Sequence, residues 1–222
     1  MTSQNDRIEQ LEKVVEQMLR PIRGVPFDLV IKAFSGFSVI SVDPDDEKDQ
    51  KLLASIAQAA HDVRGEIVRS PINRPRANEV GNDIEPFVRS ALLRLGFEVE
   101  IPKGKSGRRK TTGYPDFLLT GPDGRRTYLE CKTFSEANAD TTFRAFYLSP
   151  SDDFKVGMDA RHLLLDFEMV ATPVPSGGAA YVPVRAKLIS LENLLCDVKY
   201  EFNASNRRLY RQSGSLFDIG LA

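Results

Sequence analysis

Cysteine and histidine are scarce in this chain, and their scarcity excludes several kinds of protein. Of the 222 residues, two are cysteine and two are histidine. Cys131 and Cys196 have no histidine cluster nearby, so we expect neither a zinc site nor a disulfide framework. Cysteines without such a role favour a reducing cytoplasm as the compartment.

Long apolar runs are also missing. No run approaches the roughly 20 residues that span a bilayer, and the first ten residues, MTSQNDRIEQ, lack the apolar stretch of a secretory signal. There are no internal repeats. With 41% apolar and 27% charged residues, the composition is that of a globular protein. We expect a single domain over residues 1–222.

The chain has almost no net charge, at −1, which by itself would argue against DNA binding. Distribution matters more than the sum, however. Acidic residues concentrate between 43 and 49, where Asp43-Pro44 predicts a helix start. This separation of acidic from basic residues predicts a basic cleft and an acidic surface on the opposite side of the protein. The positive residues form three groups: Arg69, Arg74 and Arg76; Lys103, Lys105, Arg108, Arg109 and Lys110; and Arg207, Arg208 and Arg211.

The most informative segment is GYPDFLLTGPDGRRTYLECKTF, residues 113–134. Residues 117–119 and 127–129 read as strands, and Pro122-Asp123-Gly124 between them is typical of a turn. If those three residues form the loop, the antiparallel register places Asp116 opposite Glu130. Opposite residues share a face, with Cβ atoms about 5 Å apart. A bulge at Gly124 would shift this register by one residue.

Alternation along the second strand brings Lys132 to the same face as Glu130 and turns Cys131 toward the core. Two carboxylates close together repel unless a cation lies between them, and Mg²⁺ accepts such oxygens while keeping several waters. A metal-bound water is more easily deprotonated, and Lys132 could orient it or stabilise charge on phosphorus. The trio suits phosphodiester hydrolysis. The competing interpretation is a surface hairpin with an ordinary ion pair.

Pro115-Asp116 with Glu130-Cys131-Lys132 resembles the PD-(D/E)xK nuclease superfamily, and most closely its type II restriction endonucleases. The resemblance implies an α/β fold with a restriction-endonuclease-like core, in which helices flank a central mixed β-sheet. It also implies Mg²⁺-dependent, sequence-specific cleavage of double-stranded DNA, with Mn²⁺ as a substitute. Asp116 and Glu130 would bind metal, and Lys132 would be catalytic. A homodimer and a separate methyltransferase in a prokaryotic cytoplasm would complete the system.

The superfamily core often begins with a helix that carries a further acid. Apolar spacing predicts a helix over 78–95, followed by a strand over 97–101. Glu85 matches the family's place for a catalytic, metal-binding acid relative to Gly96, and Glu79 is the alternative. Glu79 could equally be an ordinary acid near a helix N-terminus.

The basic segment PKGKSGRRKTTG leads directly into Asp116. Because it lies next to the expected metal site, we expect it to bind DNA phosphates rather than to be an ordinary solvated loop. The residues expected to bind DNA are Lys103, Lys105, Arg108, Arg109 and Lys110.

Within the single domain, residues 1–77 are expected to pack on or extend the catalytic core of residues 78–170, and residues 171–222 to complete it. The N-terminal region is expected to form a helix ending before Pro21, a hairpin around Ser35-Gly36, and a helix closed by Gly65. The first helix could instead form a dimer interface. Residues 142–148 and 161–170 are expected to be strands, and residues 188–198 a helix. Lys155 and Arg161 are expected to be solvated, with contact to DNA as the alternative, and His162 is expected to be structural.

Two other functions remain open from the sequence. A repair or recombination nuclease of the same superfamily would recognise mismatches or junctions. A DNA-binding protein that has lost catalysis would need no metal, although the intact Asp116, Glu130 and Lys132 argue against it.

Overall fold

The computed structural model describes residues 4–20, 22–75, 79–108, 113–135, 146–149, 151–175 and 177–200. The chain forms two compact units, one of residues 1–25 with 196–222 and the other of residues 26–195. Within the described ranges, no helix combines the length and apolarity needed to cross a membrane.

The smaller unit contains the helix α1 (Gln4–Met18) and a two-stranded sheet. As the sequence predicts, the helix ends before Pro21. None of its residues is buried, and Leu11 on its apolar stripe is 56% exposed. Strand β1 (Ile22–Pro26) pairs with β8 (Leu195–Val198), and the Gly24 N–H donates to Asp197 Oδ1 at 3.0 Å.

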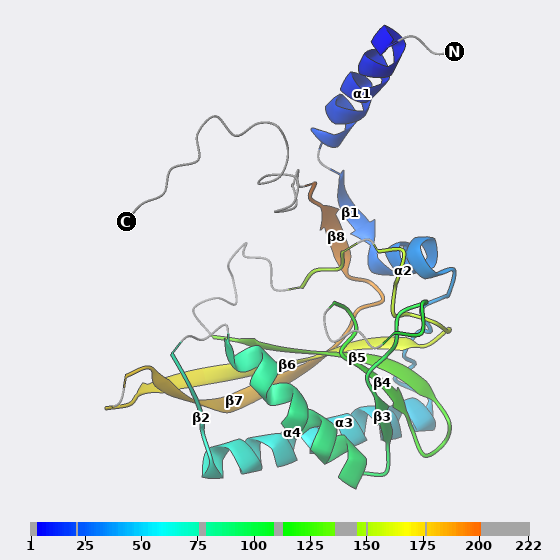
Figure 1. Cartoon of the computed structure of the whole chain (residues 1–222). Helices are drawn as coiled ribbons and strands as arrows, with labels where there is room; N and C mark the ends of the chain where they lie inside the picture. The colour runs from blue at the N-terminus through cyan, green and yellow to red at the C-terminus, as the bar shows by residue number, and fades with distance from the viewer. Residues whose placement is uncertain are drawn as a thin grey trace, which may run out of the picture. The chain divides into compact units, whose positions relative to one another are not determined.

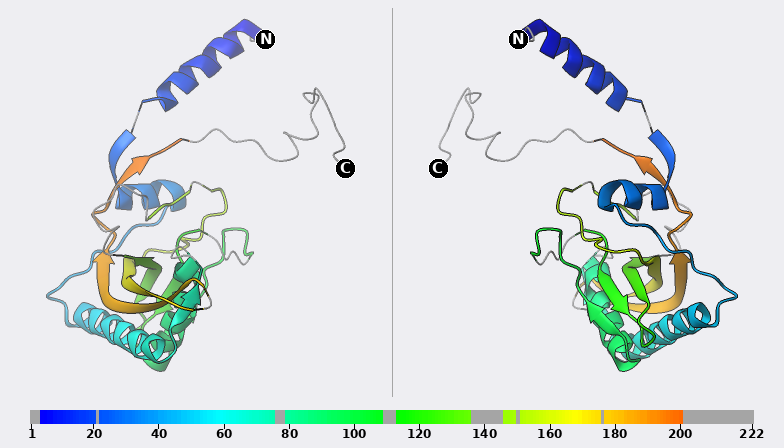
Figure 2. Two further views of the ribbon diagram at one scale, coloured as in Figure 1. Left: turned by 90° about the vertical axis from the view of Figure 1, so that its left-hand side faces the viewer. Right: turned by 90° about the vertical axis from the view of Figure 1, so that its right-hand side faces the viewer.

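The larger unit is built on a six-stranded mixed sheet with helices α3 (Glu47–Arg69) and α4 (Val80–Arg94) packed together on one side, as Figures 1 and 2 show. The predicted mixed sheet with flanking helices is confirmed. Strands β5 and β6 are parallel, and the other neighbours are antiparallel. The strand order is β2 (Ile72–Arg74), β7 (Ala179–Ser190), β6 (Arg161–Pro173), β5 (Arg126–Phe134), β4 (Phe117–Thr120) and β3 (Glu98–Glu100).

Alternation along the central strands separates the core from the opposite sheet face. Leu129 and Cys131 on β5, and Leu163, Leu165 and Phe167 on β6, are buried in the same cluster as apolar residues of α3 and α4. Each buried side chain of this size contributes roughly 1.5–3 kcal/mol. Glu130 and Lys132, the intervening residues of β5, therefore project from the other face.

Helix α2 (Phe27–Ser35) occupies the place where the sequence predicted a β-hairpin, so that prediction was wrong. Phe27 and Ile31 are fully buried while Leu29 is 56% exposed, which is the one-sided spacing of a helix rather than of a strand. Gly36, expected in a hairpin turn, is instead the C-cap at φ +81°, and its N–H donates to the Lys32 carbonyl at 3.0 Å.

The predicted helix over 188–198 was also wrong. Residues 188–190 complete β7, where Leu188 pairs with Leu165 of β6, and residues 195–198 form β8. Pairing with strands distant in the sequence determines the conformation of this segment. A short apolar run does not by itself distinguish a strand from a helix. Of the predicted strand over 142–148, residues 142–145 lie outside the described part, and 146–149 form no strand.

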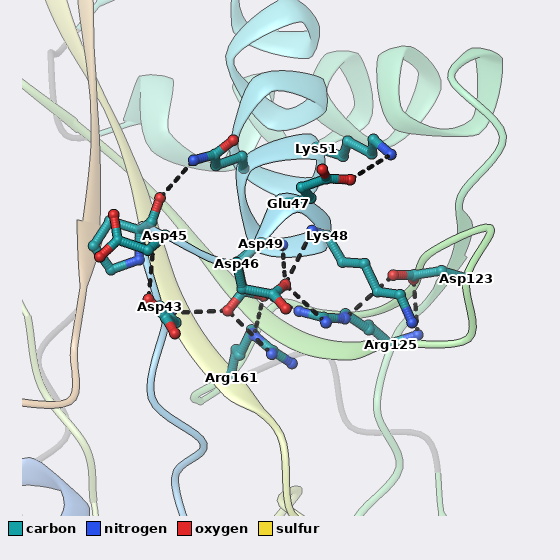
Figure 3. Close-up of polar contacts among 12 residues, drawn as sticks. Asp43, Asp45, Asp46, Glu47, Lys48, Asp49, Lys51, Asp123, Arg125 and Arg161 are labelled. Atoms are coloured by element: carbon teal, nitrogen blue, oxygen red, sulfur yellow. Dashed lines mark hydrogen bonds and ion pairs between the residues drawn. The ribbon is translucent and has the colours of Figure 1, made fainter.

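One acid at the start of α3 is a buried anchor, while Asp43, Asp45 and Glu47 are exposed. Asp46, not Asp43, caps the helix, and the helix continues past Gly65. Asp49 is 1% exposed and pairs with Arg125 of the β4–β5 turn and with Arg161 of β6, the latter at 2.7 Å (Figure 3). Burial opposes ionisation of Asp49, but hydrogen bonds from the Asp43 backbone and Arg161 lower its pKa overall. The Arg125 pair links the β4–β5 hairpin to α3, and the Arg161 pair links β6 to α3.

Candidate active site

The β4–β5 hairpin has the register that the sequence predicted. The Gly121 N–H donates to the Arg125 carbonyl at 2.9 Å, and Gly124 has φ +79°. Phe117 pairs with Leu129, so Asp116 comes opposite Glu130 at the entrance to β4. The alternative register, with a one-residue shift at Gly124, is excluded.

Three charged groups meet at this end of the hairpin. Asp116 is half-buried, and its Oδ2 accepts the Cys131 N–H at 2.8 Å. Glu130 is 4% exposed, and its Oε1 accepts Lys132 Nζ at 2.5 Å. Its other oxygen, Oε2, is buried and accepts no hydrogen bond from the described residues. A buried carboxylate oxygen without a donor is costly unless a proton or a cation compensates it.

The electrostatics of the site reflect crowded carboxyl groups. Burial, and then the charge of Asp116, raise the pKa of Glu130 to about 7. Burial also raises the pKa of Asp116, although the Cys131 N–H opposes that rise. Burial would lower the pKa of Lys132, but the Glu130 carboxylate raises it overall. Lys132 is therefore an ammonium ion beside acids that ionise reluctantly.

Glu85 of α4 belongs to the same electrostatic cluster. It is half-buried, and burial followed by the charge of Asp116 raises its pKa to about 7. Glu79 lies at the N-cap of α4, and its charge acts on Arg74. The arrangement favours Glu85 over Glu79 as the helix acid.

The donor set fits one hard divalent cation. Among the described residues, no three acids, histidines or cysteines form a preassembled ligand cluster. Mg²⁺ does not require one, because it commonly binds one or two protein carboxylates and completes its shell with water and substrate phosphate. The Glu130 Oε2 without a donor and the neighbouring Asp116 carboxylate match that requirement.

Comparison with known proteins shows the family of this chain. The model of the Type II restriction enzyme MjaV family matches residues 21–213. The chain belongs to this family. It is also 36% identical over 228 residues to the Type II restriction enzyme MjaV of Methanocaldococcus jannaschii, with 96% of each chain covered. The predicted enzyme class, a site-specific deoxyribonuclease of type II restriction, is confirmed, and the repair nuclease and the inactive DNA-binding protein are set aside.

The basic loop of this restriction enzyme is described in part. Lys103, Lys105 and Arg108 are exposed, whereas Arg109 and Lys110 lie outside the described residues. The Ser106 N–H donates to Asp153 Oδ1 at 2.8 Å, which fixes the loop to the segment 151–157. A Cβ at Gly104 would lie 2.3 Å from that oxygen, so a larger residue there would displace the Asp153 carboxylate.

Two cations expected at the solvated surface are in fact buried. Lys155 is 4% exposed and Arg161 is 9% exposed. Arg161 pairs with Asp49, while Lys155 Nζ donates to the carbonyls of Gly113 and Pro115. Sequence reasoning could not find these roles, since the partners lie about 40 or more residues away and two of them are backbone atoms.

His162 has the structural role that the sequence predicted. It is 1% exposed, and its Nδ1 lies 2.6 Å from the Tyr114 hydroxyl. Burial lowers the pKa of His162 to about 3, so the ring is neutral at physiological pH. The edge of Phe27 packs against both rings. This cluster supports the chain immediately before Asp116.

We expect Glu85→Gln to slow cleavage more than Glu79→Gln does. The charges of Asp116 and Lys132 act on the Glu85 carboxyl group, whereas the charge of Glu79 acts on Arg74. Single-turnover rates with saturating Mg²⁺ measure the difference. The reverse ranking would transfer the role to Glu79, and two small, equal effects would mean that α4 supplies no catalytic acid.

The raised pKa values also predict how pH affects stability without divalent ions. The pKa of Glu130 in the folded protein is about 7, above its ordinary value of 4.5. Between these values the folded state binds more protons than the unfolded state, so the free energy of unfolding falls as pH rises from 4.5 to 7. Urea unfolding at a series of pH values should show this fall, and Glu130→Gln should reduce it. An unchanged slope in the variant would contradict the assignment.

Proposed function

We propose that this enzyme cleaves specific sites in double-stranded DNA with Mg²⁺ held by Asp116 and Glu130 and assisted by Glu85. The observation that carries the proposal is the buried Glu130 Oε2, which receives no donor from the described residues. The same carboxylate accepts Lys132 Nζ through Oε1, and Glu130 lies opposite Asp116 in the hairpin. Mn²⁺, which accepts the same oxygen ligands, should substitute.

Each residue of the site has a separate task in this proposal. The bound ion supplies an activated water and polarises a phosphoryl oxygen. The Cys131 N–H orients Asp116 through its hydrogen bond to Oδ2, and the carboxylate so oriented would help to hold the ion. Lys132 stays protonated beside Glu130, so it is suited to orienting the attacking water or stabilising the charge that develops on phosphorus.

The basic loop is the proposed phosphate contact. Charge removal at Arg108, Arg109 or Lys110 is expected to weaken DNA binding and to reduce the salt slope by about one for each lost phosphate contact. A residue that reads a base behaves differently, because its loss relaxes specificity at one position and costs about 1–3 kcal/mol.

Binding by the three single variants should be measured against cognate and one-base-altered duplexes over a range of salt concentrations. Lys51→Ala is a matched control, since the Lys51 side chain is 78% exposed and pairs with Glu47 of the same helix, α3. Wild-type binding by all three variants at every salt concentration would remove the loop from the DNA interface.

We further propose a homodimer acting in a prokaryotic cytoplasm beside a separate methyltransferase. Palindromic sites match two-fold symmetry, and the exposed stripe of α1, Ile8, Leu11 and Val15, provides apolar surface for a second copy. Light scattering should give twice the chain mass, and Leu11→Asp should reduce it to the chain mass. A monomeric wild type would contradict the proposal.

Digestion of one plasmid of known sequence tests the proposed activity. With Mg²⁺ we expect discrete fragments whose ends all carry one sequence, and with EDTA no cleavage. Fragments with unrelated ends, or cleavage that persists without divalent ions, would contradict a metal-dependent, site-specific mechanism.

A further inference from the structure

A buried lysine outside the Asp116–Glu130–Lys132 trio contacts the segment that carries Asp116. Lys155 is 4% exposed, and its Nζ donates to the carbonyls of Gly113 at 2.6 Å and Pro115 at 3.0 Å. These carbonyls lie on either side of Tyr114, and the second belongs to the residue just before Asp116. Burying an ammonium group is costly unless hydrogen bonds and charges compensate it.

The compensating charges are those of the candidate active site. The positive charge of Lys155 lowers the pKa values of Glu85, Asp116 and Glu130, against the larger effect of burial. Lys155 is therefore close enough to interact with all three acids, and it also donates to two backbone carbonyls beside them.

The segment that carries Lys155 is fixed on both sides. Before it, Asp153 Oδ1 accepts the Ser106 N–H at 2.8 Å. After it, the Gly157 N–H donates to the Tyr128 hydroxyl of β5 at 2.9 Å. The ammonium group is thus held by a braced segment, and it acts as a fixed donor to a loop that forms no regular structure of its own.

We propose that Lys155 is a positioning residue that holds the Gly113–Pro115 backbone, and thereby sets the carboxylate of Asp116 opposite Glu130. The inference rests on the proposed role of Asp116 in cleavage. Lys155 donates to the chain leading into Asp116, so its loss should displace Asp116 without altering the DNA-binding face.

The test compares Lys155→Met with Arg161→Met. Both replacements remove a buried cation, but Arg161 pairs with Asp49 and does not contact the Gly113–Pro115 backbone. Single-turnover cleavage, cognate binding in Ca²⁺ and thermal unfolding are measured at a temperature where each variant is folded. Lys155→Gln, which keeps a side-chain N–H donor, is the second variant should the methionine replacement fail to fold.

Both methionine variants should lose thermal stability, but we expect the maximal rate of Lys155→Met alone to fall by about 100-fold, as for a displacement of about 1 Å. The DNA concentration for half-maximal rate should stay unchanged, and Lys155→Gln should retain part of the activity. Equal rates for Lys155→Met and Arg161→Met would overturn the inference, as would a wild-type rate for Lys155→Gln if only that variant folds.

Asp116→Asn distinguishes failure of the proposed active site from failure of the proposed role of Lys155. If Asp116→Asn still cleaves, the proposed site is wrong. If it is inactive while Lys155→Met cleaves normally, only the role of Lys155 fails.

Discussion

Replacing Asp116 by alanine is expected to abolish Mg²⁺-dependent cleavage while leaving the fold intact. The residue is half-buried at the entrance to β4, where its Oδ2 accepts the Cys131 N–H and its carboxyl group interacts with that of Glu130. Loss of an outer-shell partner already costs up to about 100-fold in a metal enzyme, so loss of a ligand should cost more. Plasmid cleavage and circular dichroism measure the two effects.

Asp123→Ala is the matched control for this variant. Asp123 lies in the turn of the same hairpin, where its carboxylate contacts Arg125 at 3.2 Å, away from the trio. It should cleave like wild type, and Glu130→Ala should be as inactive as Asp116→Ala. Cleavage by Asp116→Ala close to the wild-type rate would refute the metal assignment.

Replacing Lys132 by alanine is expected to suppress cleavage by about 10²–10⁴-fold while specific DNA binding is retained. Its ammonium group lies on Glu130 rather than on an exposed DNA-facing loop, and its task lies in the transition state. Single-turnover rates in Mg²⁺ and equilibrium binding in Ca²⁺ separate rate from affinity.

Lys51→Ala controls for the loss of one positive charge. The Lys51 side chain is 78% exposed on α3, and Lys51 is distant from Lys132 in the sequence. It should change neither rate nor specific binding. If Lys132→Ala lost cognate binding in proportion to its rate, Lys132 would be a DNA contact rather than a catalytic group.

The structure could be predicted from the sequence where it depends on residues that are close together along the chain. The three-residue turn at 122–124 determines the register of β4 and β5, so the approach of Asp116 to Glu130 could be predicted from spacing alone. Helix α4 was predictable for the same reason, since its apolar residues recur at helical spacing and Gly96 adopts φ +86° after its end.

The structure could not be predicted from the sequence where it depends on contacts with residues far away along the chain. The segment 27–35 is a helix because Phe27 and Ile31 bury one stripe, a preference that short apolar runs conceal. Asp49 becomes a buried anchor only because Arg125 and Arg161 reach it. Lys155 could not be singled out from its neighbours because backbone carbonyls carry no sequence signal.

The most direct test of the central claim locates the metal. Crystals of the enzyme with cognate DNA and Mn²⁺, measured near the manganese absorption edge, should show an anomalous peak bound by the carboxylates of Asp116 and Glu130. The same crystals of Glu130→Gln should lose or weaken that peak. A strong peak elsewhere, with both carboxylates unliganded, would contradict the assignment of this hairpin as the catalytic metal centre.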